Sequence, residues 1–379
     1  MFLSSLQNLG YFEEKNFYSD RIRFSVWCIL QLFLLSDNLN FTMNKKALTY
    51  DDIQLVPAYS EITSRKLINL STKVTKRYSV DMPIVASPMP TVCGLDMAIE
   101  VMKMGGVGCI HRFLSIEVQS DITAKVAAFK KENNFQLPVM AAVGANGDFF
   151  ERAQELVKSG VDIVLIDVAH GHHKNVKDAI EKIKTIDNRI DIIAGNIATA
   201  KAAIDLQNWG ADGLRVGVGG GSLCTTRIKT GFGVPNVSCL IQIIDVSEVP
   251  VMADGGLRMS GDIAKALALG SSCVMLGSLL AGTEEAPGLL INQPNGLYKK
   301  YSGAASFDTK VTHGQEVRNI EGESTIIPYK GKVKMVLESL LDGVKSALSY
   351  AGAENLAAFK PDYVEVTNAG LSEAKPHLL

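Results

Sequence analysis

Short apolar runs rich in Val, Ile and Met recur along the chain from about residue 80. Each run is apolar on both faces, which is typical of a strand buried in a parallel sheet. The runs are 82–89 (MPIVASPM), 106–111 (GVGCIH), 137–144 (LPVMAAVG), 162–169 (DIVLIDVA), 191–196 (DIIAGN), 213–218 (GLRVGV), 250–256 (PVMADGG) and 273–278 (CVMLGS).

Amphipathic stretches with helical periodicity separate most of these runs, for example 91–104, 149–159 and 260–269. Strand and helix alternating eight times predict an α/β fold of the closed (β/α)8-barrel type. A doubly wound open sheet is the alternative. It typically has fewer strands and a GxGxxG fingerprint after the first, and that fingerprint does not follow the first run here.

The carboxyl ends of the runs carry polar or glycine-rich residues, except for the third run near Gly144. Catalytic and binding groups of such barrels lie at the carboxyl ends of the strands, so this bias predicts an active site on one face. The seven ends are Ser87-Pro88-Met89, His111-Arg112, Asp167 to His170, Gly195-Asn196, Gly217 to Cys224, Asp254-Gly255-Gly256 and Gly277-Ser278.

The rhythm breaks at 295–330, a polar, glycine-containing stretch. A long insertion after the eighth strand is expected to form a lid or flap over the active face. The helical stretch 333–351 then closes the fold. We therefore predict one catalytic domain over 43–379, with a flap at about 302–331.

Residues 1–42 are unlike the rest of the chain. The apolar stretch 24–35 (FSVWCILQLFLL) is 12 residues long, whereas a spanning helix needs about 20. Met43-Asn44-Lys45-Lys46 resembles an ordinary start just before the regular pattern. We interpret 1–42 as an upstream extension that does not belong to the catalytic domain. A targeting segment and a native N-terminal arm are the alternatives.

Composition narrows the class of protein further. The 379 residues are 47% hydrophobic with a net charge of -2, and a long basic run is lacking, so nothing favours a nucleic-acid or membrane partner. The six cysteines form no CxxC pair. This usage is typical of free thiols in a reducing cytoplasm, rather than of a disulfide scaffold or a zinc site.

The most prominent candidate for chemistry is a glycine-rich loop, 217–226, that contains Cys224. Such a loop lets backbone groups approach a ligand or ion closely. A thiolate at Cys224 would be a strong nucleophile, and Thr226 could exchange a hydrogen bond with a leaving group. A glycine-rich turn with an inert buried cysteine fits the spacing equally well.

Other strand ends suggest binding functions. Barrels often bind phosphate with the loops after strands seven and eight, here Gly256 and Gly277-Ser278. Asp254 is better suited to accept hydrogen bonds from a ribose diol. In the flap, Glu321 is a candidate proton-transfer group, or else a solvated surface residue.

His170, His172 and His173 invite a zinc interpretation, but they lack a partnered set of carboxylates. We favour the interpretation that these histidines belong to a loop after strand four that contacts a cofactor.

Together these segments resemble the IMP dehydrogenase / GMP reductase family, from about Tyr50 to about Asn368. The most specific motifs are Gly-Ser-x-Cys-Thr-Thr at 221–226, YDDIQLVP at 50–57, ADGG at 253–256, GTEE at 282–285 and PYKG at 328–331. The resemblance implies that Cys224 is the nucleophile. It also implies a covalent thioimidate at purine C2, which the dehydrogenase hydrolyses after oxidising IMP with NAD. The reductase instead releases ammonia from GMP and then reduces the intermediate with NADPH.

The resemblance favours the reductase on three grounds. There is no room for a pair of CBS modules between 110–113 and 137. The flap 302–331 has no Arg-Tyr pair, which in the dehydrogenase activates water, and its one arginine is Arg318. The segments 166–172, 229–233 and 301–306 resemble the second bacterial type of GMP reductase. IMP dehydrogenase remains the alternative, and a non-catalytic sensor of purine nucleotides the minor one.

The resemblance also implies the roles of individual residues. Cys224, Thr226 and Glu321 are expected to be catalytic. The expected GMP or IMP contacts are Ser87, Met89, Ser222, Asp254, Gly256, Gly277, Ser278, Tyr301, Gly303, Ala304, Arg318 and Gly322. NADPH is expected near Asp167, Ala169 and Asn196. A K⁺ ion on the carbonyls of Gly217, Gly219 and Cys224 and a homotetramer are expected as well.

Two positions depart from the family pattern, and one segment weakens the choice of GMP over IMP as the substrate. Pro90 stands where the family normally has Asp or Gln, and Gly220 where it normally has Pro. Ala286-Pro287-Gly288 also occurs in dehydrogenases.

Overall fold

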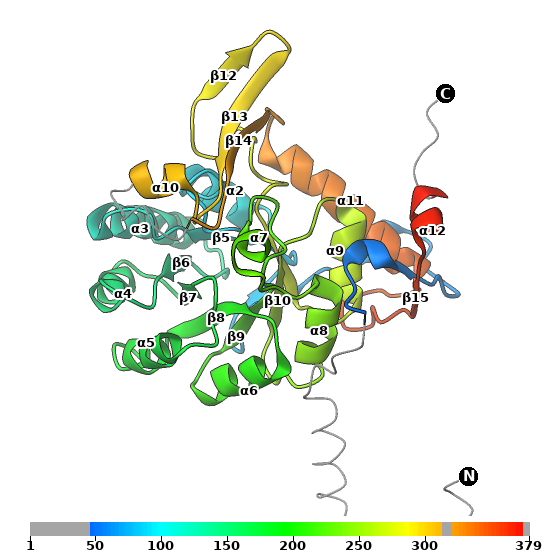
Figure 1. Ribbon diagram of the computed structural model, residues 1–379, viewed down its shortest axis with the longest axis horizontal. Helices are drawn as coiled ribbons and strands as arrows, with labels where there is room; N and C mark the ends of the chain where they lie inside the picture. Colours follow the sequence, from blue (N-terminus) through cyan, green and yellow to red (C-terminus); the bar gives the residue numbers. More distant parts are fainter. Residues whose placement is uncertain (1–45, 313–319, 374–379) are drawn as a thin grey trace, which may run out of the picture. The chain divides into compact units, whose positions relative to one another are not determined.

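The computed structural model describes residues 46–312 and 320–373, and the prediction for 1–42 falls outside them. Eight parallel strands close into a barrel in the order β10-β11-β4-β5-β6-β7-β8-β9 (Figure 1). The predicted (β/α)8 barrel is confirmed, with one strand in each predicted run. These strands are β4 (Ile84–Ala86), β5 (Val107–Ile110), β6 (Met140–Val143), β7 (Ile163–Asp167), β8 (Asp191–Ile197), β9 (Gly213–Val216), β10 (Val251–Asp254) and β11 (Cys273–Leu276).

The barrel strands are nearly all buried, because side chains fill the interior and helices cover the outside. This two-sided burial explains why the runs are apolar throughout rather than alternating. The closing contact is between the last and first strands, where Val274 of β11 pairs with Ile84 of β4.

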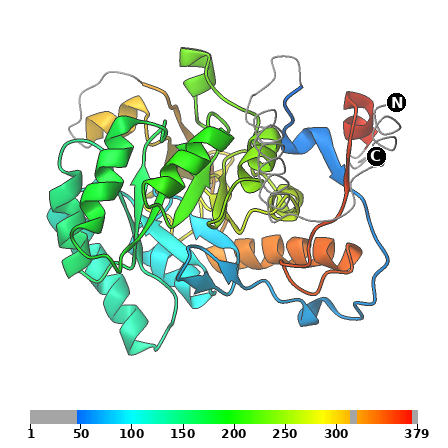
Figure 2. The ribbon, with the colours of Figure 1, turned by 90° about the horizontal axis from the view of Figure 1, so that it is seen from below.

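A ring of helices surrounds the barrel. Helix α11 contacts both α2 and α9, and it lies along one side of the barrel in Figure 2. The link from β5 to β6 is the single helix α3. The helices of the ring are α2 (Leu95–Lys103), α3 (Ile116–Glu132), α4 (Phe149–Lys158), α5 (Lys174–Lys184), α6 (Ala200–Asn208), α8 (Asn236–Ile244), α9 (Ser260–Ala268) and α11 (Val333–Tyr350).

A short hairpin of β2 (Thr72–Lys73) and β3 (Ser79–Val80) lies at the amino ends of the barrel strands. The Thr75 hydroxyl donates to the buried Asp191 carboxylate at 2.5 Å, and Arg77 donates to the same group at 2.6 Å. Asp191 is the first residue of β8, so these bonds join the hairpin to the end of the barrel opposite the predicted site.

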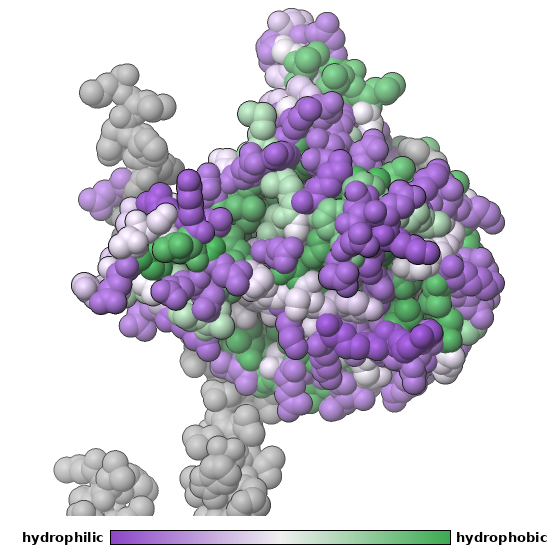
Figure 3. All heavy atoms as spheres, turned by 180° about the vertical axis from the view of Figure 1, so that it is seen from behind, coloured by the Kyte–Doolittle hydropathy of each residue, from purple (hydrophilic) through white to green (hydrophobic). Residues whose placement is uncertain are grey.

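The predicted flap is more regular than its sequence suggests. It also starts earlier than the predicted bounds of about 302–331, because its antiparallel sheet begins with β12 (Leu290–Gln293) and β13 (Gly296–Ser302). The third strand of this sheet is β14 (Ser324–Pro328), and α10 (Phe307–Thr312) lies between β13 and β14. The sheet projects beyond the barrel in Figure 1. Figure 3 shows apolar atoms near the end of this projection, where Leu289, Leu290 and Leu297 are exposed.

Smaller elements complete the described chain. None of its helices is long and apolar enough to cross a membrane. The smaller elements are the 3-10 turns η1 (Tyr50–Asp52) and η2 (Arg65–Leu67), the paired strands β1 (Ile53–Leu55) and β15 (Tyr363–Glu365), and the short helices α7 (Thr226–Thr230) and α12 (Asn368–Glu373).

Candidate active site

A cavity of about 490 Å³ opens at the carboxyl ends of the barrel strands. This volume falls within the range of small-molecule sites. Seven of the eight strands or the loops after them supply its lining, together with the flap. Among the described residues, β6 contributes none of the lining, which agrees with the lack of a reactive group near Gly144.

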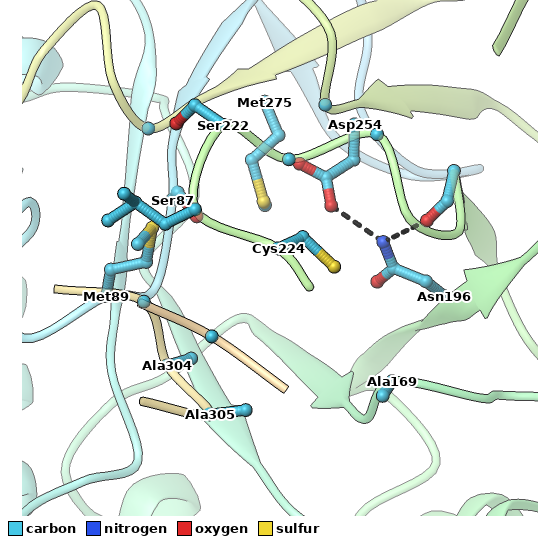
Figure 4. Close-up of a pocket in the computed structure, with 18 of the residues that line it drawn as sticks. Ser87, Met89, Ala169, Asn196, Ser222, Cys224, Asp254, Met275, Ala304 and Ala305 are labelled. Atoms are coloured by element: carbon cyan, nitrogen blue, oxygen red, sulfur yellow. Dashed lines mark hydrogen bonds between the residues drawn. The ribbon is translucent and has the colours of Figure 1, made fainter. Parts of the chain in front are cut away.

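The structure brings nearly all the predicted site residues together around this cavity (Figure 4). Arg318 lies outside the described residues. The residues that line the cavity are Ser87, Met89, Asp167, Ala169, Asn196, Gly217, Gly219, Ser222, Cys224, Thr226, Asp254, Gly256, Gly277, Ser278, Tyr301, Gly303, Ala304, Glu321 and Gly322.

Cys224, Thr226 and Glu321 form a hydrogen-bonded relay. The Cys224 thiol donates to the Thr226 hydroxyl at 3.2 Å, and that hydroxyl donates to Oε2 of Glu321 at 2.7 Å. Cys224 is partly exposed, whereas the other described cysteines are buried. A partly exposed thiol is therefore linked to a carboxylate through one hydroxyl group, an arrangement that can move a proton to or from a bound ligand.

Main-chain bonds explain how the flap carboxylate reaches the cysteine loop. Gly322 forms isolated β-bridges with both Cys224 and Ser306. The amide of Thr225 donates to the Glu321 carbonyl at 3.0 Å, and the amide of Glu323 donates to the Leu223 carbonyl at 3.0 Å. The cysteine loop and the flap are thus joined by backbone on both sides of the relay.

A buried arginine that the sequence analysis overlooked organises the floor of the cavity. Arg215 contacts Oδ1 of Asp167 at 2.5 Å and Oδ2 of Asp254 at 3.0 Å. Burial works to lower the pKa of Arg215, but the two carboxylates outweigh it and hold that pKa above its ordinary value. An arginine within the apolar run 213–218 was the available signal, because a buried charge requires partners.

Asp254 is held by a second donor. The Asn196 side-chain amide donates to Oδ2 of Asp254 and to the Gly217 carbonyl, each at 2.7 Å (Figure 4). Among the described residues, Oδ1 of Asp254 accepts no hydrogen bond. That oxygen is available to accept hydroxyl groups of a ligand, which suits the predicted ribose contact.

Small and hydroxyl-bearing residues frame the opposite side of the cavity. The hydroxyls of Ser222 and Tyr301 lie 3.0 Å apart. A Cβ added to Gly277 would lie 3.2 Å from the Met89 sulfur and 3.3 Å from the Tyr301 hydroxyl. Burial raises the pKa of Tyr301, which keeps its hydroxyl neutral and able to donate. This close-fitting group of donors suits a phosphate.

Other lining residues were missed by the sequence analysis, notably Met275 and Lys310, whereas Arg112 belongs to one of the predicted strand ends. Met275 lies in β11 and Lys310 in α10. Arg112 donates to the Asp167 carbonyl at 3.2 Å. Nothing in the local sequence of Met275 or Lys310 separates these side chains from ordinary strand and helix residues.

The histidine cluster does not contribute to the cavity lining. His172 is hydrogen-bonded to Asp205 at 2.8 Å, and the His173 ring accepts from the Asn175 amide at the start of α5. Within the described part of the chain, no group of three or more His, Cys, Asp or Glu residues is placed to hold a metal ion. A zinc site there is not supported.

The expected K⁺ ligands lie in the loop after β9. Gly217 and Gly219 both have positive φ angles, 138° and 83°, a conformation that glycine adopts readily. The Gly217 carbonyl already accepts from Asn196, so a cation here would share that oxygen with an amide donor.

The fold and the site define a (β/α)8 barrel with a cavity at the carboxyl ends of its strands and a partly exposed cysteine in the loop after β9. The model of the IMP dehydrogenase / GMP reductase domain matches residues 47–377, and the chain belongs to that family. Members of the family act on IMP or GMP with a nicotinamide cofactor.

Relatives of both names are similar to this chain. An inosine-5'-monophosphate dehydrogenase of Borreliella burgdorferi is 35% identical over 88% of this chain and 98% of its own. A GMP reductase of Leishmania major is 30% identical over 88% of this chain and 97% of its own. A crystal structure of Trypanosoma brucei GMP reductase in complex with guanosine 5'-monophosphate has a TM-score of 0.84 and 28% identity. The structural alignment covers 89% of this chain and 99% of the Trypanosoma chain.

The lengths of these relatives bear on the argument from missing CBS modules. The alignment with the Leishmania reductase extends over 476 residues and that with the Borreliella dehydrogenase over 396. Of these two relatives, the longer one is named a GMP reductase and the shorter one is named an IMP dehydrogenase. The short connection between β5 and β6 does not separate the two activities.

Proposed function

We propose that this protein is a GMP reductase, which converts GMP to IMP and ammonia at the expense of NADPH in purine salvage. The observation that carries the proposal is the Cys224–Thr226–Glu321 relay beside a flap without an Arg-Tyr pair. The relay can protonate a departing amine, whereas the group that activates water in the dehydrogenase is missing from 302–331.

The barrel order supports a division of the cavity into two sides. The cysteine loop follows β9, which lies between β8 and β10. The proposed GMP contacts follow β10, β11 and β4 on one side of that loop. Asp254 receives the ribose diol, while Ser222, Gly256, Gly277, Ser278 and Tyr301 surround the phosphate. The purine then extends toward Cys224 and the flap residues Gly303 and Ala304.

In the first half of the proposed reaction, Cys224 attacks C2 of the purine. A carbon–sulfur bond forms, the bond from C2 to the exocyclic nitrogen breaks, and ammonia departs after it receives a proton through Thr226 and Glu321. In the second half, C2 gains a hydride, the electron pair of the carbon–sulfur bond returns to Cys224, and IMP is released. The sum is GMP, NADPH and two protons giving IMP, NADP⁺ and ammonium.

NADPH supplies the hydride when it is bound. Asp167, Ala169 and Asn196 line the cavity at the ends of β7 and β8, on the other side of the cysteine loop from the proposed phosphate contacts. These residues fit a ribose and carboxamide better than a second phosphate, because Asp167 is acidic. Their proposed task is to orient the cofactor toward C2.

IMP dehydrogenase is the second candidate, favoured by the higher identity to the Borreliella relative and by Ala286-Pro287-Gly288. The deciding assay gives purified protein GMP with NADPH, or IMP with NAD. We expect NADPH consumption with GMP and release of ammonia. NADH formation from IMP without NADPH loss from GMP would overturn the proposal. Tight nucleotide binding without cofactor turnover would indicate the sensor.

Two variants test the covalent step. Cys224→Ala should abolish turnover, and Cys239→Ala is the matched control, since Cys239 is buried in α8 away from the cavity. Appreciable turnover by Cys224→Ala would refute covalent catalysis. The proposed K⁺ site is tested by the melting temperature in KCl against NaCl, where a specific gain in KCl is expected.

A further inference from the structure

Gly220, where the family normally has proline, lies directly against the side chain of Asn236. A Cβ built on Gly220 would be 2.8 Å from both Nδ2 and Oδ1 of Asn236, closer than real Cβ contacts occur. Gly220 is not one of the residues with positive φ. The side chain of Asn236 in its present position, and not the backbone conformation, therefore leaves room only for glycine here.

The same amide group contacts the loop after β10. Nδ2 of Asn236 donates to the Gly255 carbonyl at 2.5 Å and to the Asp254 carbonyl at 3.3 Å. It also lies 3.1 Å from the position that a Cβ on Gly256 would take. Asn236 is only 6% exposed, so one buried amide touches both the nucleophile loop and the turn that carries Asp254.

The two loops also approach each other directly beside this amide. A Cβ on Gly255 would lie 2.9 Å from the carbonyl carbon of Gly220 and 3.0 Å from the amide nitrogen of Gly221. Gly255 has a φ of 88°, which glycine tolerates. The spacing between the loops is thus set by backbone contact on one side and by Asn236 on the other.

We infer that Asn236 is a positioning residue that fixes the cysteine loop relative to the Asp254–Gly256 turn, and that Gly220 provides the space for its side chain. The inference rests on the proposed function, in which these two segments hold one nucleotide. Ribose and phosphate anchored at Asp254 and Gly256 present C2 to Cys224 only if the spacing is kept. A misplacement of about 1 Å can slow a positioned reaction by roughly 100-fold.

Asn236→Ala is therefore expected both to weaken GMP and IMP binding and to lower the turnover number for GMP. We expect about a 10-fold rise in the dissociation constants and a loss of kcat/KM for GMP of roughly 100-fold. Asn236→Gln is the conservative variant. It keeps the amide but lengthens the side chain, so it should recover activity only partly.

Gly220→Ala forces a methyl group against the amide and should have a similar effect. The space is vacant in the Asn236→Ala background, so the second substitution should then add little. A double-mutant cycle of these two positions measures the coupling. We expect the losses in the double variant to be well below the product of the two single losses.

Gln119→Ala is the matched control. Gln119 is also a buried amide that donates to two main-chain carbonyls, those of Ile110 and Ala142, and it does not line the cavity. It should lower the melting temperature while leaving nucleotide affinity nearly unchanged. If Asn236→Ala behaves in the same way, the residue is merely structural and the inference fails. Independent effects at Gly220 and Asn236 would also overturn it.

The readouts are nucleotide dissociation constants and the rate of Cys224 alkylation by iodoacetamide, with and without GMP. Neither depends on which reaction the enzyme catalyses. If the unmodified protein binds neither GMP nor IMP, it is the proposed function that fails. If it binds them and Asn236→Ala binds equally well with equal protection of Cys224, the positioning role is refuted.

Discussion

The hydroxyl of Thr226 lies 2.7 Å from a carboxylate oxygen of Glu321, although the two residues are 95 positions apart in the chain. Thr226 begins α7 in the loop after β9, and Glu321 belongs to the flap. The barrel thus supplies Cys224, the proposed nucleophile, and the flap supplies the carboxylate at the other end of the relay.

Replacing Glu321 with glutamine should remove proton delivery while keeping the shape of the relay. We expect kcat for GMP to fall by about 10²- to 10⁴-fold, the usual contribution of a general acid or base, with little change in GMP affinity. Steady-state assays and a binding titration measure the two effects. Glu323→Gln is the control, because Glu323 is exposed, and wild-type turnover by Glu321→Gln would exclude the proposed role.

Arg215→Met should leave Asp167 and Asp254 facing each other without the cation between them. Breaking a buried ion pair costs about 3–5 kcal/mol, so chemical denaturation should show a large loss of stability, with weaker GMP binding. Arg189→Met is the comparison. Arg189 forms an ion pair with Asp187, but its side chain is 82% exposed. This ion pair should therefore contribute little to the stability of the fold. Equal losses in both variants would contradict a special role for Arg215.

Lys299 joins the projecting sheet to the loop after β11. Its ammonium group is buried and donates to the carbonyls of Thr283 (3.0 Å), Glu284 (3.1 Å) and Ala286. Lys299→Met should therefore leave buried carbonyls unpaired and cost about 1–3 kcal/mol.

Urea unfolding measures this loss, with Lys300→Met as the control. Lys300 is the next residue, about half exposed, and pairs with Asp308. We also expect a higher KM for GMP in Lys299→Met, because Tyr301 lies two residues further along β13. Unchanged stability in Lys299→Met would show that the three bonds are not formed.

Alkaline pH should destabilise the fold through its buried thiols. Burial raises the pKa of Cys239 and that of Cys273 from 9.0 to about 12. Between pH 9 and 12 the unfolded chain loses these protons while the native protein retains them. The stabilisation is complete below about pH 9 and is lost as the pH rises toward 12.

Melting temperatures from pH 8 to 11 test this expectation. They should fall with increasing pH, and Cys273→Ala should give a shallower slope, since one of the buried thiols is removed. A melting temperature that is constant over this range, or an unchanged slope in the variant, would contradict the assignment.

The sequence was sufficient to predict the barrel because parallel strands buried on both faces are apolar without interruption. The predicted runs were longer than the strands, however. The run 82–89 contains β4 only at Ile84–Ala86, because the chain leaves the sheet at Ser87 to line the cavity. Polar residues at strand ends therefore predicted the site better than they predicted strand boundaries.

The sheet of the flap was not predicted, because β13 (GLYKKYS) has no clean alternation of apolar and polar residues. Arg215 was overlooked inside an apolar run, and Asn236 has no local signal at all. The importance of both comes from partners far away in the chain, which a single sequence does not reveal. Glu321 was predicted as a candidate acid, but its hydrogen bonds to the cysteine loop were visible only in three dimensions.

The open Oδ1 of Asp254 has a consequence for the choice between ribonucleotides and their deoxy counterparts. Arg215 and Asn196 occupy the other oxygen, so in the proposed complex the hydroxyls of the sugar diol bind at Oδ1. A 2'-deoxynucleotide offers a single hydroxyl there and forfeits one hydrogen bond to a charged group, worth about 1.5–3 kcal/mol. The loss of this hydrogen bond would make the enzyme roughly tenfold or more selective for ribonucleotides, the precursors of RNA, over the deoxyribonucleotides that are the precursors of DNA.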